Sequence, residues 1–141
     1  KKHLTWNQIA ELSDKGISFG SHTVTHPDLS SLNSNDLEYE IRQSKETIED
    51  KIGKSIDTFS YPFKFPDKKK AFINHLRTLL QKYGYHYGVS TRVGTTSKED
   101  DRYFMKRIPA NSGDDILLFR AKLEGGYDWL FPLQKLRKSW N

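Results

Sequence analysis

The alternation of two apolar patterns along the chain is the feature that most constrains its fold. Short apolar runs bounded by turn residues predict β-strands, and apolar residues at helical spacing predict helices between them. The expected strands span 17–20, 56–61, 85–90 and 103–108. The expected helices run from Thr5 to about Lys15, from Asn35 to Gly53, from about Asp67 to Lys82, and from Ser112–Asp115 through Leu123. Thr5 and Gln8 have the spacing of a capping box at the start of the first helix. Strands that alternate with helices are typical of a parallel sheet, so the sequence predicts an α/β fold.

The helix over 35–53 has the clearest pattern. Its apolar positions recur at helical spacing, Gly53 fits the stop signal, and Glu38 follows Asn35 at the distance of a capping pair. No repeat, low-complexity tract or break in composition interrupts the chain, so residues 1–141 are predicted to form a single domain.

Composition permits a packed core and narrows the function classes. Hydrophobic residues make up 35% and aromatic residues 13% of the 141, which argues against wholesale disorder. The length falls short of the roughly 250 residues of a complete (β/α)8 barrel. The absence of cysteine excludes disulfides, thiolate zinc sites and cysteine nucleophiles from this chain. No run of about 18 apolar residues occurs, so no membrane span is predicted.

The charge balance does not favour a nucleic-acid partner. Lys plus Arg exceeds Asp plus Glu by 23 − 18 = 5, and the acidic residues are interspersed. The basic stretch 64–70 and the basic tail with Lys135, Arg137 and Lys138 could contact phosphates or an anionic polymer, but a solvated face is the preferred interpretation. No nucleic acid is therefore expected among the partners.

In parallel α/β folds, functional groups lie on loops that leave the carboxyl ends of the strands. Three loops meet this condition here, after Gly20, after Ser60 and after Ser90. The first contains His22 and His26, and two imidazoles four residues apart can converge on one metal ion if the loop makes a turn. A capped turn with two surface histidines is the competing interpretation, and a third ligand would have to come from elsewhere.

These residues resemble a known family. The stretch Leu4–Gln8 followed by Phe19–Leu29 is similar to the second motif of NodB-like polysaccharide deacetylases (carbohydrate esterase family 4), whose pattern is H-[ST]-x-x-H-P. Phe59-Ser60-Tyr61-Pro62-Phe63 resembles the third motif. Tyr85–Thr91 resembles the strand that follows, and the stretch from Arg107-Ile108-Pro109 to Leu123 resembles the C-terminal part of the family.

The resemblance implies a fold, an activity and a site. The fold would be a portion of a distorted (β/α)7 barrel with parallel strands, and the activity would be removal of acetyl groups from a polysaccharide, N-acetyl amino sugars above all. A divalent metal, zinc by preference, would be held by His22, His26 and an Asp. The backbone N–H of Phe63 would stabilise the oxyanion, and Tyr61, Pro62 and Phe63 would contact the substrate. The location would be extracellular or in the cell envelope.

Departures from the family pattern qualify these expectations. Nothing in residues 1–20 resembles the Asp-Asp-Gly motif that carries the metal Asp and the general base. Ser60 stands where many members have Arg, Lys64 where many have Gly, and no His follows His86. We therefore expect a domain that lacks the first strand or strands, is inactive alone, and could self-associate to complete the barrel. The alternative is a non-catalytic domain that binds a glycan or a protein partner.

Overall fold

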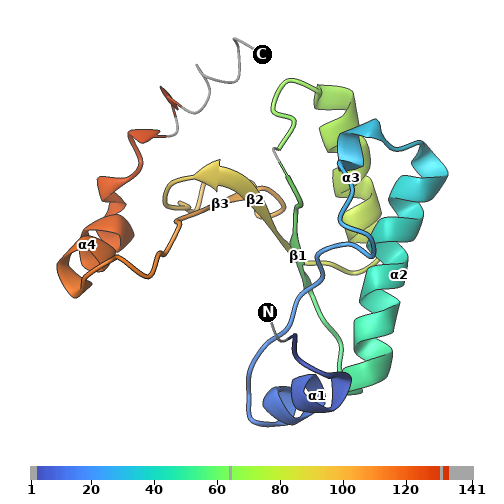
Figure 1. Ribbon diagram of the computed structural model, residues 1–141. Helices are drawn as coiled ribbons and strands as arrows, with labels where there is room; N and C mark the ends of the chain where they lie inside the picture. The colour runs from blue at the N-terminus through green and yellow to red at the C-terminus, as the bar shows by residue number, and fades with distance from the viewer. Residues whose placement is uncertain (1–2, 64, 131, 134–141) are drawn as a thin grey trace.

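The computed structural model describes residues 3–63, 65–130 and 132–133. Figure 1 shows its elements in chain order. They are α1 (Trp6–Asp14), the 3-10 turn η1 (Leu29–Ser31), α2 (Ser34–Ile52), β1 (Thr58–Ser60), α3 (Lys70–Lys82), β2 (Tyr87–Val93), β3 (Met105–Arg107), α4 (Ile116–Ala121) and the π-type turn η2 (Lys122–Gly126).

A parallel sheet in the order β1-β2-β3 forms the centre of the described chain. Ser21 adds one parallel bridge to Phe59, which also pairs with Gly88 of β2, so Ser21 lies on the outer side of β1. The Ser21 N–H donates to the Thr58 carbonyl at 2.9 Å, and the Ser60 N–H donates to the Ser21 carbonyl at 2.8 Å. Each segment thus lies beside its predecessor in the chain. This order is typical of a (β/α) barrel and differs from the reversed order of doubly wound sheets. The predicted parallel α/β fold is confirmed.

The predicted strand over 17–20 is wrong. Only Ser21 pairs with β1, and Ile17 is 53% exposed, so the apolar alternation in this stretch does not mark a buried face. Two other strands are shorter than predicted, β1 covering three residues and β3 three. The strand predicted over 85–90 is β2, which begins two residues later, at Tyr87. Tyr85 is buried in the core instead, and the N–H groups of His86 and Tyr87 both donate to the Asp57 carbonyl.

Helix ends follow local capping chemistry. At α1 the predicted capping box is confirmed, with the Gln8 N–H donating to Thr5 Oγ1 at 3.3 Å and the Thr5 N–H to Gln8 Oε1 at 2.9 Å. At α2 the cap is Asn33, whose side chain accepts from the Asp36 N–H at 3.0 Å, so the expected cap at Asn35 is wrong. Gly53 ends α2 with φ 67°, the left-handed conformation that glycine tolerates best.

The third helix begins later than predicted. Tight turns through residues 65–70 precede it, and α3 starts at Lys70 with Lys69 as a cap that makes no side-chain hydrogen bond.

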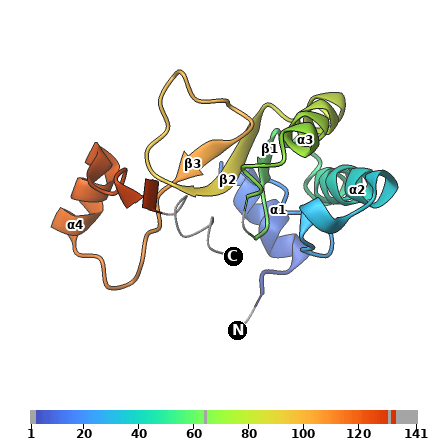
Figure 2. The ribbon, with the colours of Figure 1, turned by 90° about the horizontal axis from the view of Figure 1, so that it is seen from above.

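Helices α2 and α3 lie side by side against one face of the sheet, as Figures 1 and 2 show. The core lies between these helices and the strands. Its buried members are Leu29, Leu37, Ile41, Phe59, Tyr61, Phe65, Leu76, Leu79, Leu80, Tyr85, Tyr103 and Phe104. Aromatic rings from β1, the segment after it and the segment before β3 pack together in this core and fix the carboxyl end of β1. The contacts of Tyr61 with Phe59 and Phe65 are edge to face, and that of Phe65 with Phe104 is tilted.

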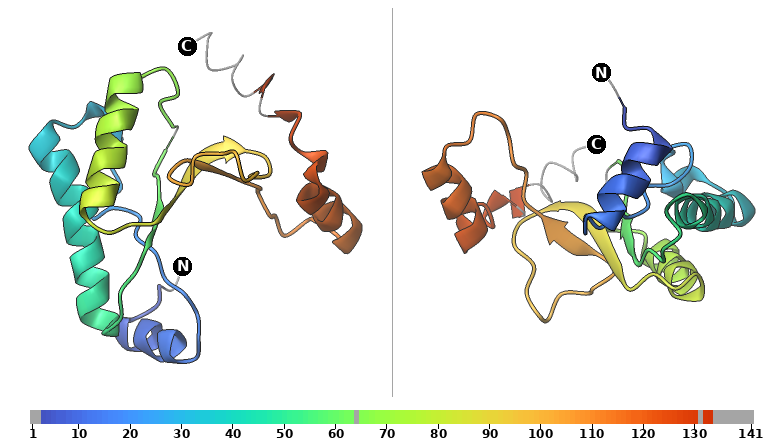
Figure 3. Two further views of the ribbon diagram at one scale, coloured as in Figure 1. Left: turned by 180° about the vertical axis from the view of Figure 1, so that it is seen from behind. Right: turned by 90° about the horizontal axis from the view of Figure 1, so that it is seen from below.

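The C-terminal segment stands on the other side of the sheet from α2 and α3 (Figure 3). Asp115 caps α4 by accepting from the Leu118 N–H at 2.7 Å, as its place in the predicted helix start suggests. The apolar residues that predict this helix are not buried, since Ile116 and Leu117 are 76% and 75% exposed. Residues 134–141, which contain the basic tail, lie outside the described residues.

Candidate metal-binding site

His22 follows the Ser21 bridge and reaches across to the end of the neighbouring strand. Its Nδ1 lies 2.7 Å from the Ser60 carbonyl oxygen. A carbonyl oxygen only accepts, so Nδ1 carries a proton, and in the neutral imidazole Nε2 keeps its lone pair. A backbone carbonyl that fixes the tautomer in this way is typical of metal-ligating histidines. The contact with the end of β1 therefore leaves Nε2 of His22 available.

His26 lies beside His22. The ring centroids are 4.8 Å apart with an interplanar angle of 74°, and both side chains are exposed. Two imidazoles on one ion lie roughly 5 Å apart, centre to centre, because Zn–N bonds are about 2.1 Å long. The structure thus brings the predicted pair together at a separation that fits a shared divalent metal. That a metal binds here, and which metal it is, stay predictions.

The loop between the histidines has a strained backbone. Thr23 has φ 70° and His26 has φ 57°, a region that non-glycine residues seldom adopt and β-branched residues avoid. Thr23 Oγ1 accepts a hydrogen bond from the His26 N–H at 3.0 Å, which closes the turn. The turn is what places the second imidazole beside the first.

The buried carboxylate of Glu40, on α2, binds this loop. Glu40 Oε2 accepts from the N–H groups of Val24 at 2.6 Å and Thr25 at 3.0 Å, and Oε1 accepts from the Thr25 hydroxyl at 2.5 Å. Burial alone would raise the pKa of Glu40, but these hydrogen bonds, that of the Thr25 hydroxyl foremost, hold the pKa below its ordinary value. The carboxylate is therefore ionised at neutral pH.

The sequence reasoning missed Glu40, although one signal could have found it. Buried α2 residues fall at positions 37, 40, 41 and 44, and a Glu occupies one position of this otherwise apolar or small stripe. Charged side chains are seldom buried without a partner, so a Glu at such a position predicts a set of donors facing it.

Ser21 is fixed from the same helix. Ser44 Oγ donates to the Glu40 carbonyl at 2.7 Å, so its contact of 2.5 Å with Ser21 Oγ has Ser21 as the donor. Both serines are buried. The bond ties the residue before His22 to α2, and the position of His22 follows from it.

The segment after β1 contributes Phe63 to the site. Its ring lies 4.7 Å from the His26 ring and is 54% exposed, and its φ is 53°. Among the residues that the structure describes, none accepts a hydrogen bond from the Phe63 N–H. Tyr61 and Pro62 are buried, and the Tyr61 hydroxyl donates to the Tyr103 carbonyl at 3.0 Å. The oxyanion and substrate-binding roles of these three residues stay predictions, and Phe63 alone presents an exposed ring.

The other three histidines of the chain do not join the pair. His3, His75 and His86 are exposed, and His86 faces Asp57 at 3.5 Å. Within residues 3–63, 65–130 and 132–133, no group of three His, Cys, Asp or Glu side chains is arranged to hold a metal ion.

The basic stretch is only partly described. Lys64 lies outside the described residues, and Lys69 Nζ contacts the Ser30 carbonyl and hydroxyl at 3.3 and 3.2 Å. Lys68 and Lys70 are exposed, which agrees with the solvated face that the sequence suggests.

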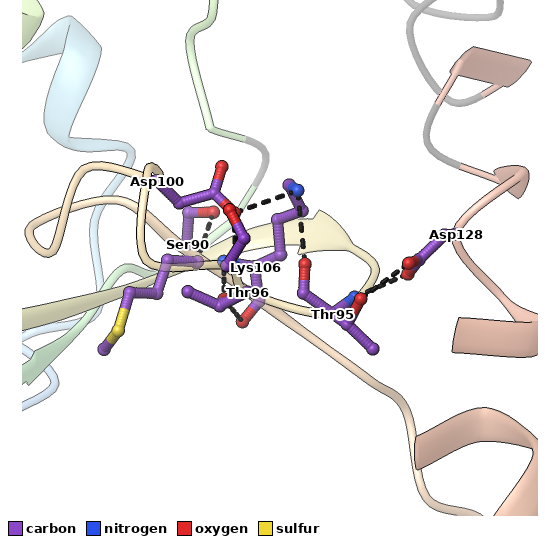
Figure 4. A network of polar contacts seen from close by, with 8 residues as sticks. Ser90, Thr95, Thr96, Asp100, Lys106 and Asp128 are labelled. Atoms are coloured by element: carbon purple, nitrogen blue, oxygen red, sulfur yellow. Dashed lines mark hydrogen bonds and ion pairs between the residues drawn. The ribbon is translucent and has the colours of Figure 1, made fainter. Parts of the chain in front are cut away.

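The loop after β2 carries a polar network, drawn in Figure 4. The Thr95 N–H and hydroxyl both donate to the Asp128 carboxylate at 2.6 Å, and these bonds lower the pKa of Asp128, the hydroxyl more than the amide. Lys106 Nζ donates to the Thr95 carbonyl at 3.2 Å and to Asp100 at 3.1 Å. The network ties the C-terminal segment to the sheet.

The fold and the histidine pair define a class, an α/β domain of the NodB-like deacetylase fold. Among solved structures, the Streptococcus pyogenes deacetylase PplD in complex with acetate aligns with a TM-score of 0.75 at 22% identity, over 86% of this chain and 51% of that one. The deacetylase domain of BpsB from Bordetella bronchiseptica aligns with a TM-score of 0.61 at 16% identity, over 74% and 48%. At these identities the likeness establishes the fold.

Sequence comparison then gives the family. The polysaccharide deacetylase family model matches residues 1–88, more than half of the chain. "Putative polysaccharide deacetylase YxkH" of Bacillus subtilis strain 168 is 28% identical over 124 residues, which cover 88% of this chain and 42% of that protein. The chain belongs to the polysaccharide deacetylase family, and it spans about half the length of these relatives. No helix of the described part is both long and apolar enough to cross a membrane.

Proposed function

We propose that the protein is a metal-dependent hydrolase that removes acetyl groups from a polysaccharide, with N-acetyl amino sugars as the substrate class. The observation that carries this proposal is the placement of His22 and His26, with His22 Nδ1 held by the Ser60 carbonyl. Membership of the deacetylase family supports it. Because such polymers lie outside the cytoplasmic membrane, we propose an extracellular or cell-envelope location.

The residues of this chain would act in two ways. His22 through Nε2 and His26 through its imidazole would hold the ion, and imidazole suits zinc well. When bound, such an ion lowers the pKa of a coordinated water to about 7 and polarises the acetyl carbonyl. The Phe63 N–H would donate to the carbonyl oxygen as negative charge develops there. Hydrolysis breaks the amide C–N bond and releases acetate and the amine.

Two groups that this chemistry needs would come from beyond the described residues. We propose that an Asp completes the metal site and that a second carboxylate acts as general base. The 141-residue chain alone would then bind the ion weakly and turn over little or no substrate. A second copy of the chain could help to complete the barrel, which sedimentation velocity would detect as a dimer.

A zinc titration of the chain tests the site. We expect one Zn²⁺ per chain, with affinity reduced by an order of magnitude or more in His22→Ala and His26→Ala. His75→Ala is the matched control, because His75 is an exposed histidine on α3. If His22→Ala and His26→Ala bind Zn²⁺ as well as the control does, the proposal is wrong.

A non-catalytic glycan-binding domain is the second candidate. It is favoured by the finding that no carboxylate among the described residues joins the histidine pair. An assay on a longer protein that spans the whole barrel distinguishes the two functions. Release of acetate from an N-acetylated oligosaccharide supports the hydrolase, whereas glycan binding without release supports the second candidate.

A further inference from the structure

We infer that Glu40 is a positioning residue for the His22–His26 pair, its carboxylate holding the loop between the two histidines in the conformation that brings their rings together. The inference rests on the proposed function in so far as the pair is a metal site. Glu40 touches neither imidazole, so its effect would pass through the backbone of Val24 and Thr25.

The hydrogen bonds account for both oxygens of the carboxylate. Oε2 accepts two consecutive backbone N–H groups, from Val24 and Thr25, and Oε1 accepts the Thr25 hydroxyl. Hydrogen bonds to a charged acceptor are about twice as strong as those between neutral groups. Two of the three residues between the histidines are thus fastened to one side chain.

Apart from the Glu40 bonds, one hydrogen bond within the turn is the main contact among the described residues that holds the shape of the loop. Val24 is exposed, so no apolar anchor fixes the middle of the turn. Thr23 and His26 both have positive φ, and such backbone persists only where surrounding contacts enforce it. Without the carboxylate, the bond between Thr23 Oγ1 and the His26 N–H would be the main tie left within the turn.

The helix that carries Glu40 is itself held firmly in place. It is 6% exposed and lies on the buried face of α2, next to Ile41, which is fully buried. The helix is capped at both ends, by Asn33 and Gly53. The carboxylate therefore holds the loop in a fixed position relative to α2, a capped helix with a buried face.

The same helix offers a matched control. Glu49 also accepts a backbone N–H, from Ile56 at 2.9 Å, together with the Ser55 hydroxyl at 3.0 Å and Lys45 Nζ at 2.9 Å. It stabilises the segment before β1 instead of the histidine loop. Loss of Glu49 should perturb the fold in a comparable way without reaching His22 or His26.

The experiment compares Glu40→Ala, Glu40→Gln and Glu49→Ala in the 141-residue chain. We expect Glu40→Ala to weaken Zn²⁺ binding about 10- to 100-fold, the usual range for loss of a group that orients metal ligands. Glu40→Gln should restore most of the affinity, because its amide oxygen can accept the two N–H groups and the Thr25 hydroxyl can turn to accept from Nε2. Glu49→Ala should bind Zn²⁺ like the unsubstituted chain.

A measurement on the metal-free chain separates this inference from the proposed function. Amide hydrogen exchange should speed up at Val24 and Thr25 in Glu40→Ala and at Ile56 in Glu49→Ala. Equal loss of Zn²⁺ affinity in Glu40→Ala and Glu49→Ala, or unchanged exchange at Val24 and Thr25 in Glu40→Ala, overturns the inference. If the unsubstituted chain binds no Zn²⁺, the proposed site fails, and the exchange data decide whether Glu40 holds the loop. If Glu40→Ala does not fold, Thr25→Val removes one of the three bonds, and Thr25→Ser should restore it.

Discussion

Replacing Tyr61 by Phe separates two roles that the segment after β1 could give this residue. The family resemblance predicts a contact with substrate, whereas the structure places the ring in the core with its hydroxyl donating to the Tyr103 carbonyl at 3.0 Å. The substitution deletes one oxygen atom and keeps the ring. If the residue is structural, stability falls and ligand binding at the surface does not change.

The expected loss of stability follows from the contacts that Tyr61→Phe keeps. The ring centroid of Tyr61 lies 5.0 Å from Phe59, 5.2 Å from Phe65 and 5.8 Å from Phe104, and a Phe at this position retains these contacts without leaving a large cavity. What is lost is one buried hydrogen bond, which costs about 1–2 kcal/mol of the free energy of unfolding. Deleting the whole ring in Tyr61→Ala would cost about 3–5 kcal/mol.

Urea unfolding followed by tryptophan fluorescence measures the difference. With a slope of about 2 kcal/mol per M, the midpoint of Tyr61→Phe should fall by roughly 0.5–1 M with the slope unchanged. Burial raises the pKa of the Tyr61 hydroxyl well above its usual 10.0, so the hydroxyl remains a donor and the decrease should be the same at pH 5 and pH 9. An unchanged midpoint together with weaker binding of an N-acetylated oligosaccharide would refute the structural role.

Three further predictions concern stability. The pKa of Glu40 in the folded protein lies below its ordinary 4.5. The contribution of Glu40 to the free energy of unfolding is therefore complete above pH 4.5 and is lost as the pH falls through the folded-state pKa. Acid unfolding of Glu40→Gln should lack this loss. Gly88→Ala should cost about 2 kcal/mol or more in urea unfolding, because the new Cβ would lie 2.2 Å from a backbone carbonyl oxygen, whereas Gly113→Ala meets open space and should cost under about 0.5 kcal/mol. Lys122→Met should lower the thermal midpoint, because Lys122 is fully buried and its loss leaves the Asp114 carboxylate without its ion-pair partner. Adding Asp114→Asn to Lys122→Met should recover part of the loss.

The elements that follow from local chemistry could be predicted from the sequence. The capping box at Thr5, the stop at Gly53 and the helical stripe of α2 depend on neighbours within a few residues, and the structure confirms them. The strand predicted over 17–20 depends on a partner far away in the chain. Its alternation of Ile17 and Phe19 resembles that of a strand, yet only Ser21 finds hydrogen-bond partners on β1.

The last helix shows the same limit for burial. Apolar residues in the stretch that begins at Ile116 predict a helix, and a helix forms there. Periodicity says which residues share a face, but it does not say whether another element covers that face. In the described chain, polar contacts of Asp128 with Thr95 hold the C-terminal segment to the loop after β2, and the contact of Lys122 with Asp114 lies within the segment itself.

At the candidate site, the sequence identifies the histidine pair but not the groups that hold it in place. His22 and His26 are recognisable from their spacing, whereas the Ser60 carbonyl and the Glu40 carboxylate meet them only through the fold. A backbone carbonyl has no sequence signature at all. The interpretation of the pair as a capped turn and its interpretation as a ligand set also prove compatible, because the turn is capped by Thr23 and brings the rings together.

Backbone strain in the described residues is concentrated at this site. Thr23, His26 and Phe63 are the non-glycine residues of the described chain with positive φ, and the rings of the last two are in contact. Each such residue costs on the order of 1 kcal/mol or more, so chance placement of all three around one histidine pair is a poor explanation. The cost is offset by rigid neighbours. These are the Glu40 carboxylate bound to the loop, the Ser21–Ser44 bond before the loop, and the packed rings of Tyr61 and Phe65 on either side of Phe63 in the chain. A site held in this way before any ligand arrives loses little conformational entropy when the ligand binds. The energetic case for a binding function therefore rests on where the strain lies as much as on which residues are present.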